Sequence, residues 1–139
     1  MLDPMLDTLF PWMHLAGRVV FAVSMMVLSA GHFTATDAVA GYAASKGTPA
    51  PKAAVLASGI MVWAGAILIA LGWHRFIGAG FIILFLVPVA FKIHNYWSVS
   101  DSNMRMVDRI QFWKNIGLAG AALFIAVYGR FEWPLSLGR

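Results

Sequence analysis

The stretch 53-AAVLASGIMVWAGAILIALG-72 decides the fold, because it runs for twenty residues without one charged side chain. A helix of that length rises about 30 Å, which is the thickness of the hydrocarbon core of a bilayer. In lipid, only helices and closed barrels pair all their backbone hydrogen-bonding groups, and barrel strands alternate apolar with polar residues. The apolar residues here are continuous, so the stretch predicts a transmembrane helix.

Three further apolar stretches have the same character: Leu15–Phe33, Phe76–Phe91 and Ile110–Tyr128. Four spans occupy more than half of the 139 residues, which leaves room for a single domain, residues 1–139. The polar link between the second and third spans is so short that they must be antiparallel neighbours. We therefore predict an all-α integral membrane protein, an antiparallel four-helix bundle with both termini on one side.

The composition agrees with a membrane location. The chain is 60% hydrophobic and 12% charged, and five of its six tryptophans lie at span ends, as in the aromatic belts of membrane proteins. The net charge of +4 comes from basic residues scattered over the span ends, which favours contact with lipid headgroups and argues against nucleic acid. Cysteine is absent, which excludes disulfides, iron–sulfur clusters and thiolate metal sites within the chain.

The segments between the spans predict smaller elements. Residues 1–14 carry apolar side chains near helical spacing, interrupted by Pro11, and predict a short helix on the membrane surface. Residues 38–45 predict a short helix in the first loop, and Pro51 suits the first turn of the second span. Residues 100–111 predict a second surface helix before the fourth span.

Two arginines lie close to span ends on the side that carries the termini. An arginine at the bilayer centre costs about 2.5–3.5 kcal/mol on insertion scales, but one turn from a span end its side chain reaches the headgroups at lower cost. We therefore interpret Arg18 and Arg75 as membrane anchors. For Arg18 the alternative is an ion pair or a ligand contact inside the bundle.

The alternation of the spans sorts the polar residues onto two sides of the membrane. The side with the first and third loops collects His32, His94, Asn95, Asp101, Lys114 and Asn115. Such a convergence at one end of the bundle makes this the candidate functional site. One interpretation is a structural network around Asn95 and Asp101, in which Asp101 pairs with Lys114 or Lys92.

Two other interpretations assign a ligand to this cluster. In a quinone or lipid pocket, the histidines would donate hydrogen bonds to carbonyl groups and Lys114 would stabilise negative charge. The residues of that candidate pocket are His32, His94, Trp97, Lys114 and Asn115, with Trp97 as a stacking face. Alternatively, the two histidines would ligate a haem, although no supporting motif accompanies them.

Motifs of soluble enzymes are absent. The sequence has no Gly-rich phosphate loop, no metal-spaced His/Glu set and no nucleophile elbow. Four short spans also lack the inverted repeats typical of transporters. We therefore assign no catalytic residue and no metal site, and the balance favours a protein that is not an enzyme.

Several short motifs, taken in order, resemble the DoxX-like family of small four-helix bacterial membrane proteins. They are Ser29-Ala30-Gly31-His32-Phe33, Gly47-Thr48-Pro49-Ala50-Pro51, Gly65–Gly72 followed by Arg75, His94-Asn95-Tyr96-Trp97, and Phe112–Gly117. The resemblance extends from Leu15 to Arg130. It departs from the family at Val62, where members often carry a glutamate, and at Ala66, which replaces a glycine. A buried acid would be functional by default, so its loss favours an accessory role.

The resemblance implies an integral protein of the bacterial inner membrane, in some members associated with quinone-linked oxidoreductases or oxidative-stress complexes. We therefore expect a non-catalytic subunit of a larger membrane assembly, respiratory or redox, with lipids and other membrane subunits as partners and no cofactor of its own. One alternative is a quinone-binding oxidoreductase subunit with its pocket at the His32/His94 end. A lipid- or cargo-handling membrane chaperone is the other.

Overall fold

The computed structural model describes residues 4–138, and this part of the chain contains helices but no strand. The elements are α1 (Pro4–Ser29), α2 (Gly31–Thr34), α3 (Thr36–Ser45), α4 (Pro51–Leu71), α5 (Arg75–Lys92), the 3-10 helix η1 (Tyr96–Ser98) and α6 (Ser102–Tyr128). Four helical stretches are long and apolar enough to cross a membrane, namely Met5–Thr34, Pro51–Leu71, Arg75–Ser98 and Ser102–Tyr128. The predicted all-α membrane bundle is confirmed.

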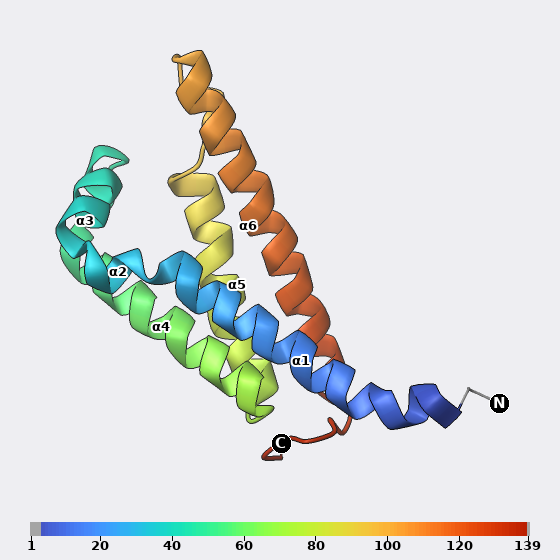
Figure 1. The fold of residues 1–139 in the computed structure, drawn as a ribbon. Helices are drawn as coiled ribbons and strands as arrows, with labels where there is room; N and C mark the ends of the chain where they lie inside the picture. The colour runs from blue at the N-terminus through green and yellow to red at the C-terminus, as the bar shows by residue number, and fades with distance from the viewer. Residues whose placement is uncertain (1–3, 139) are drawn as a thin grey trace.

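Helices α4 and α5 form the centre of the bundle. Helix α1 packs on α4, α4 packs on α5, and α5 packs on α6, whereas α1 and α6 make no comparable contact. Figure 1 shows α1 lying obliquely across the bundle and α6 extending beyond the end of α5. The buried core draws on all four long helices and contains Ala22, Met25, Val62, Ala66, Ile69, Ile82, Leu86, Ala119 and Ala122.

The turn between α4 and α5 is as tight as the sequence predicts. Gly72 has a φ of 64°, in the left-handed region that favours glycine, and its N–H donates to the carbonyl of Ile69 (3.0 Å). The N–H of Trp73 donates to the carbonyl of Leu68 (2.9 Å), which closes the end of α4. Because α5 begins only three residues later, the two helices run antiparallel side by side.

The two predicted surface helices belong instead to longer helices. Helix α1 continues through Pro11 without a break. Proline removes one backbone hydrogen bond from the helix, but ending the helix in lipid would leave several backbone groups unpaired, at a higher cost in free energy. Helix α6 begins at Ser102, where the Asp101 carboxylate accepts a hydrogen bond from the Met104 N–H (2.8 Å). The predicted short helix at residues 38–45 is confirmed as α3, and Pro51 opens α4.

The contact between α4 and α5 depends on two glycines. A Cβ atom placed on Gly65 would lie 2.8 Å from the Gly78 carbonyl oxygen, and one placed on Gly78 would lie 3.0 Å from the Gly65 carbonyl oxygen. Both obstacles are backbone atoms, which cannot swing away as a flexible side chain would. Small residues at such points let helices approach closely in lipid, where the hydrophobic effect does not drive them together.

Replacing Gly65 with alanine should destabilise the bundle, because the added methyl group pushes α4 and α5 apart. Overpacking of this kind costs about 1–3 kcal/mol. We expect a lower midpoint of thermal unfolding for Gly65→Ala in mild detergent. Gly80→Ala is the matched control, since a Cβ on Gly80 meets no atom within 4 Å. Equal midpoints for the wild type and Gly65→Ala would contradict the close approach.

Candidate functional site

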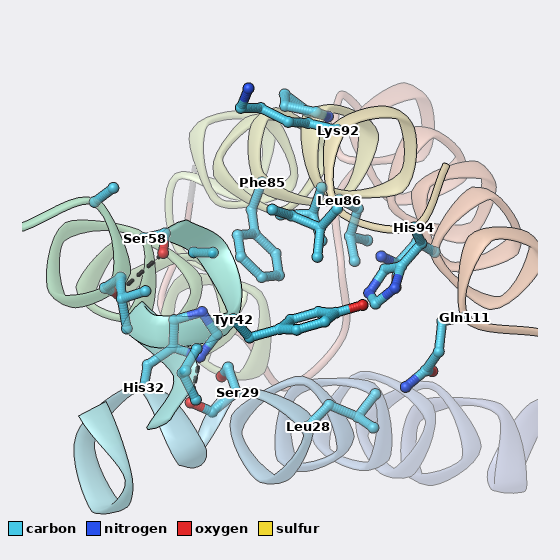
Figure 2. Close-up of a pocket in the computed structure, with 18 of the residues that line it drawn as sticks. Leu28, Ser29, His32, Tyr42, Ser58, Phe85, Leu86, Lys92, His94 and Gln111 are labelled. Carbon is cyan, nitrogen blue, oxygen red and sulfur yellow. Dashed lines mark hydrogen bonds between the residues drawn. The ribbon is translucent and has the colours of Figure 1, made fainter. Parts of the chain in front are cut away.

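A cavity of about 350 Å³ lies at the end of the bundle that carries the first and third loops. Figure 2 shows that its walls come from several helices and from the first loop. The volume lies within the range of small-molecule sites, roughly 300–1,000 Å³. Most of the wall is apolar and includes Met25, Leu28, Val55, Phe85, Leu86 and Leu118. The cavity is therefore suited to a ligand with a large apolar part.

Four of the five predicted pocket residues line this one cavity. His32 comes from α2, His94 follows α5, and Lys114 and Asn115 come from α6. Five polar residues that were not assigned to a pocket from the sequence also line it: Ser29, Tyr42, Thr48, Ser58 and Gln111. The topology thus brings polar groups from distant points of the sequence, between Ser29 and Asn115, to one largely apolar cavity.

His32 is held by its own helix turn and by two neighbouring helices. Its Nδ1 lies 2.9 Å from the Ser29 carbonyl oxygen, and its ring packs edge-on against Phe85 at 5.5 Å between centroids. Gly59 of α4 makes room for it, because a Cβ there would lie 2.8 Å from the His32 Cβ. The imidazole is therefore fixed against the wall of the cavity, with its Nε2 left for other partners.

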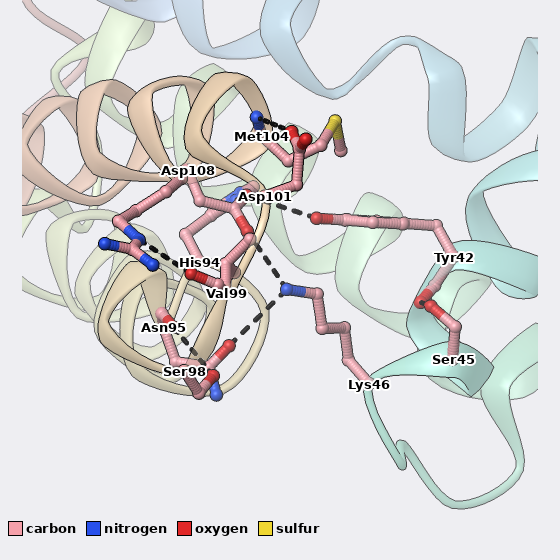
Figure 3. Close-up of polar contacts among 11 residues, drawn as sticks. Tyr42, Ser45, Lys46, His94, Asn95, Ser98, Val99, Asp101, Met104 and Asp108 are labelled. Carbon is pink, nitrogen blue, oxygen red and sulfur yellow. Dashed lines mark hydrogen bonds and ion pairs between the residues drawn. The ribbon is translucent and has the colours of Figure 1, made fainter.

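A buried carboxylate ties the first loop to α5 and α6. The Asp108 side chain is only 4% exposed, and Lys46 Nζ lies 3.0 Å from its Oδ2. Its Oδ1 lies 3.2 Å from the Tyr42 hydroxyl and 3.0 Å from His94 Nδ1 (Figure 3). Lys46 Nζ also lies 3.5 Å from Asn95 Oδ1. We call Asp108, Lys46, Tyr42 and His94 the Asp108 latch.

Tyr42 and Lys46 both keep their protons over the neutral pH range. Burial and the nearby Asp108 charge raise the pKa of Tyr42, so the phenol stays a neutral donor. Burial lowers the pKa of Lys46, but the hydrogen bond and the charge of Asp108 outweigh burial and raise that pKa overall. Lys46 is therefore an ammonium whose charge balances the carboxylate.

The acid of the polar network is thus Asp108, which corrects the expectation for Asp101. Asp101 is exposed and caps α6, and no ion pair within residues 4–138 joins it to Lys114 or Lys92. Asp108 was missed although its spacing carries a signal. Together with four buried residues it forms one helical stripe: Asp108, Phe112, Asn115, Ala119 and Ala122.

Trp97 lies outside the cavity. Its side chain is exposed and belongs to an aromatic group with Phe91, Tyr96 and Phe112, at centroid distances of 5.2–6.3 Å. The expected stacking face for a ligand is therefore not supplied by Trp97. Its position is that of a residue in the interfacial aromatic belt.

Arg18 and Arg75 are buried rather than directed to the headgroups, which corrects their interpretation as anchors. Arg18 is 5% exposed and donates to the carbonyl groups of Pro134 (Nη1, 3.0 Å) and Leu135 (Nη2). Arg75 is 3% exposed and lies 4.9 Å from the Trp133 ring centroid. The C-terminal segment covers this end of the bundle. Its carbonyl groups and the Trp133 ring interact with the two guanidinium groups and so offset the cost of burying them.

Comparison with known proteins confirms the predicted resemblance. The sequence profile of the DoxX family matches residues 13–95, more than half of the chain. Inner membrane protein YphA of Escherichia coli (strain K12) is 29% identical over 119 residues, which cover 86% of this chain and 84% of that protein. No solved structure gives a significant match. With four apolar helices of spanning length, this similarity shows an integral inner membrane protein.

Replacing Asp108 with alanine should release α3 from the bundle, because it strands Lys46 without its counter-charge. Breaking a fully buried ion pair costs about 3–5 kcal/mol, and the cost here is smaller because the Lys46 side chain is 18% exposed. Faster hydrogen exchange of the α3 backbone in Asp108→Ala would show the release. Asp37→Ala is the control, since it removes an exposed pair with Lys52 and should leave exchange unchanged. Equal protection of α3 in Asp108→Ala and the wild type would rule the latch out.

Proposed function

The chain belongs to the DoxX family of membrane proteins, and on that premise we propose that it is a non-catalytic membrane subunit that binds a quinone-type ligand in its cavity. The observation that carries the proposal is the chemistry of the cavity wall. An apolar chamber reached by His32, His94, Lys114 and Asn115 suits an amphipathic molecule with oxygen atoms on its headgroup. The role in a respiratory or redox assembly is part of the same proposal.

Lys114 is the strongest polar feature of this wall. It lies within the membrane-spanning helix α6, it is half-buried, and no ion pair within residues 4–138 engages it. A cation at such depth is costly, so it is expected to serve a ligand or a pathway. Its ammonium group can donate to a headgroup oxygen, and the neighbouring amide of Asn115 can do the same.

Thr48 is, after Lys114, a second residue whose surroundings indicate a ligand in the cavity. Its hydroxyl group is buried, lines the cavity and has no hydrogen-bond partner within residues 4–138. Buried polar groups are normally paired, so a ligand atom within reach would satisfy it. The residues present therefore fit a quinone headgroup, which when bound would supply electron-transfer chemistry. The chain's own part is to bind and orient the headgroup and to exclude water.

Filling the cavity should abolish ligand binding without removing any polar group. Ala54 lines the cavity, so Ala54→Phe places a ring where the ligand would lie. We expect a decyl-tailed benzoquinone to bind the wild type, measured by equilibrium dialysis of protein in nanodiscs, and to lose at least tenfold in affinity for Ala54→Phe. Ala57→Phe, exposed on the same helix and outside the cavity, is the matched control and should bind like the wild type.

Two results would overturn the cavity assignment. One is equal binding to the wild type and Ala54→Phe, which would place the quinone elsewhere. The other is recovery of phospholipid but no quinone from the cavity of protein extracted in mild detergent. The second result would favour the lipid-handling alternative.

A second observation favours contact with another subunit. A Cβ placed on Gly117 or Gly120 of α6 would meet no atom within 4 Å, and both glycines are exposed. By helical spacing they share a face of α6 with the exposed Trp113 and Phe124, and their lack of side chains implies a shallow notch between the two rings. Such a notch lets a neighbouring helix approach closely in lipid. This face of α6 is proposed as the contact, whereas Ala66 of α4 lies in the core and is not available to a partner.

Replacing Gly117 with leucine should remove the chain from its assembly while it still inserts into the membrane. The leucine fills the notch and blocks close approach of a partner helix. The measurement is the amount of stoichiometric membrane partner that co-purifies in mild detergent. Gly80→Leu on α5, also in open space, controls for bulk on a lipid-facing surface. An unchanged partner yield from Gly117→Leu would exclude this face as the contact.

A further inference from the structure

We infer that the cavity prefers the reduced, dihydroxy form of a quinone-type headgroup over its dicarbonyl form. The inference rests on the proposed function and specifies the ligand class that the same site selects. It follows from the hydrogen-bonding state of the two histidines in the wall, His32 and His94. Both rings use Nδ1 for a bond to an oxygen atom that can only accept.

The partner of His32 fixes its tautomer. Nδ1 lies 2.9 Å from the Ser29 carbonyl oxygen, so Nδ1 must carry the hydrogen. The imidazole is half-buried in a membrane-spanning segment, and no carboxylate within the described residues is paired with it. A charged ring would be costly there, so the ring is neutral and its Nε2 is a hydrogen-bond acceptor.

The partner of His94 fixes its tautomer in the same way. Nδ1 lies 3.0 Å from Oδ1 of Asp108, and a carboxylate accepts hydrogen bonds but does not donate them. As a neutral ring, His94 therefore also presents Nε2 as an acceptor, and no hydrogen bond among residues 4–138 occupies it.

Two acceptors in the wall select a headgroup that donates. A quinone carbonyl has no hydrogen to give, and placing it against an imidazole Nε2 leaves both groups unpaired. A quinol hydroxyl donates to Nε2 and still accepts from the ammonium of Lys114 or the amide of Asn115. Figure 2 shows His32 near the backbone end of the Tyr42 side chain and His94 near its hydroxyl end, so the two histidines border different parts of the cavity wall.

The test compares three decyl-tailed ligands with the same six-membered ring and two ring oxygens on wild-type protein in nanodiscs: the benzoquinone, its hydroquinone kept reduced under argon, and the hydroquinone dimethyl ether. The dimethyl ether matters because it keeps the ring and oxygens but cannot donate. Equilibrium dialysis should show the hydroquinone binding about tenfold tighter than the other two ligands. This is the difference in affinity expected when one ligand forms a hydrogen bond that the others cannot form. The wild-type comparison requires no variant to fold.

His32→Phe tests the assignment to a residue. It keeps the ring against Phe85 and removes the acceptor, so the preference for the hydroquinone should fall by at least threefold. His74→Phe, at the opposite end of the bundle, should leave the preference intact. Equal binding of all three ligands would overturn the inference and leave the proposed function standing. Binding of none would overturn both, and a preference unchanged by His32→Phe would remove the role given to this residue.

Discussion

The carboxylate of Asp108 is the point where α3, the end of α5 and α6 meet, since it accepts hydrogen bonds from Lys46, Tyr42 and His94. A buried charge is tolerated only when it is paired and fully hydrogen-bonded, so these side chains cannot move independently. Tyr42 and His94 also line the cavity. The shape of the cavity therefore depends on the hydrogen bonds of Asp108, which lies just outside it. These bonds also set the orientation of Tyr42 and His94 in the cavity wall.

Most of the fold could be predicted from the sequence because the bilayer imposes a simple rule on length and polarity. The second and third spans were predicted at 53–72 and 76–91 and lie at Pro51–Leu71 and Arg75–Lys92, and in the second span Pro51 and Gly72 mark the two ends. The first and last helices are longer than predicted. Hydropathy detects only the apolar part of a helix, and α6 also includes the polar residues before that part, as far as its cap at Asp101.

The part of the site that could be predicted is the part set by topology, namely which residues lie at the same end of the bundle. His32, His94, Lys114 and Asn115 come together because antiparallel spans return to the same side. The partner of His94 depends instead on the rotation of α6, and Asp108 is distinguished from Asp101 only by its helical spacing to buried residues. Trp97 of η1 faces outward, and the topology of the spans does not determine this either. Apolar composition says little about rotation, because lipid-facing and buried positions of such helices are equally apolar.

The docking of the C-terminal segment on Arg18 has a consequence for biogenesis. The carbonyl acceptors of this guanidinium lie 116 and 117 residues later in the chain. Synthesis proceeds from the N-terminus, so the first helix enters the bilayer before the carbonyl groups that later accept from its arginine exist, and the long side chain lowers the cost by reaching toward the headgroups. Closure of this end of the bundle is therefore a late event. Until the C-terminal segment docks, the Arg18 guanidinium lacks its carbonyl acceptors. This unpaired charge distinguishes the incompletely folded chain from the folded protein.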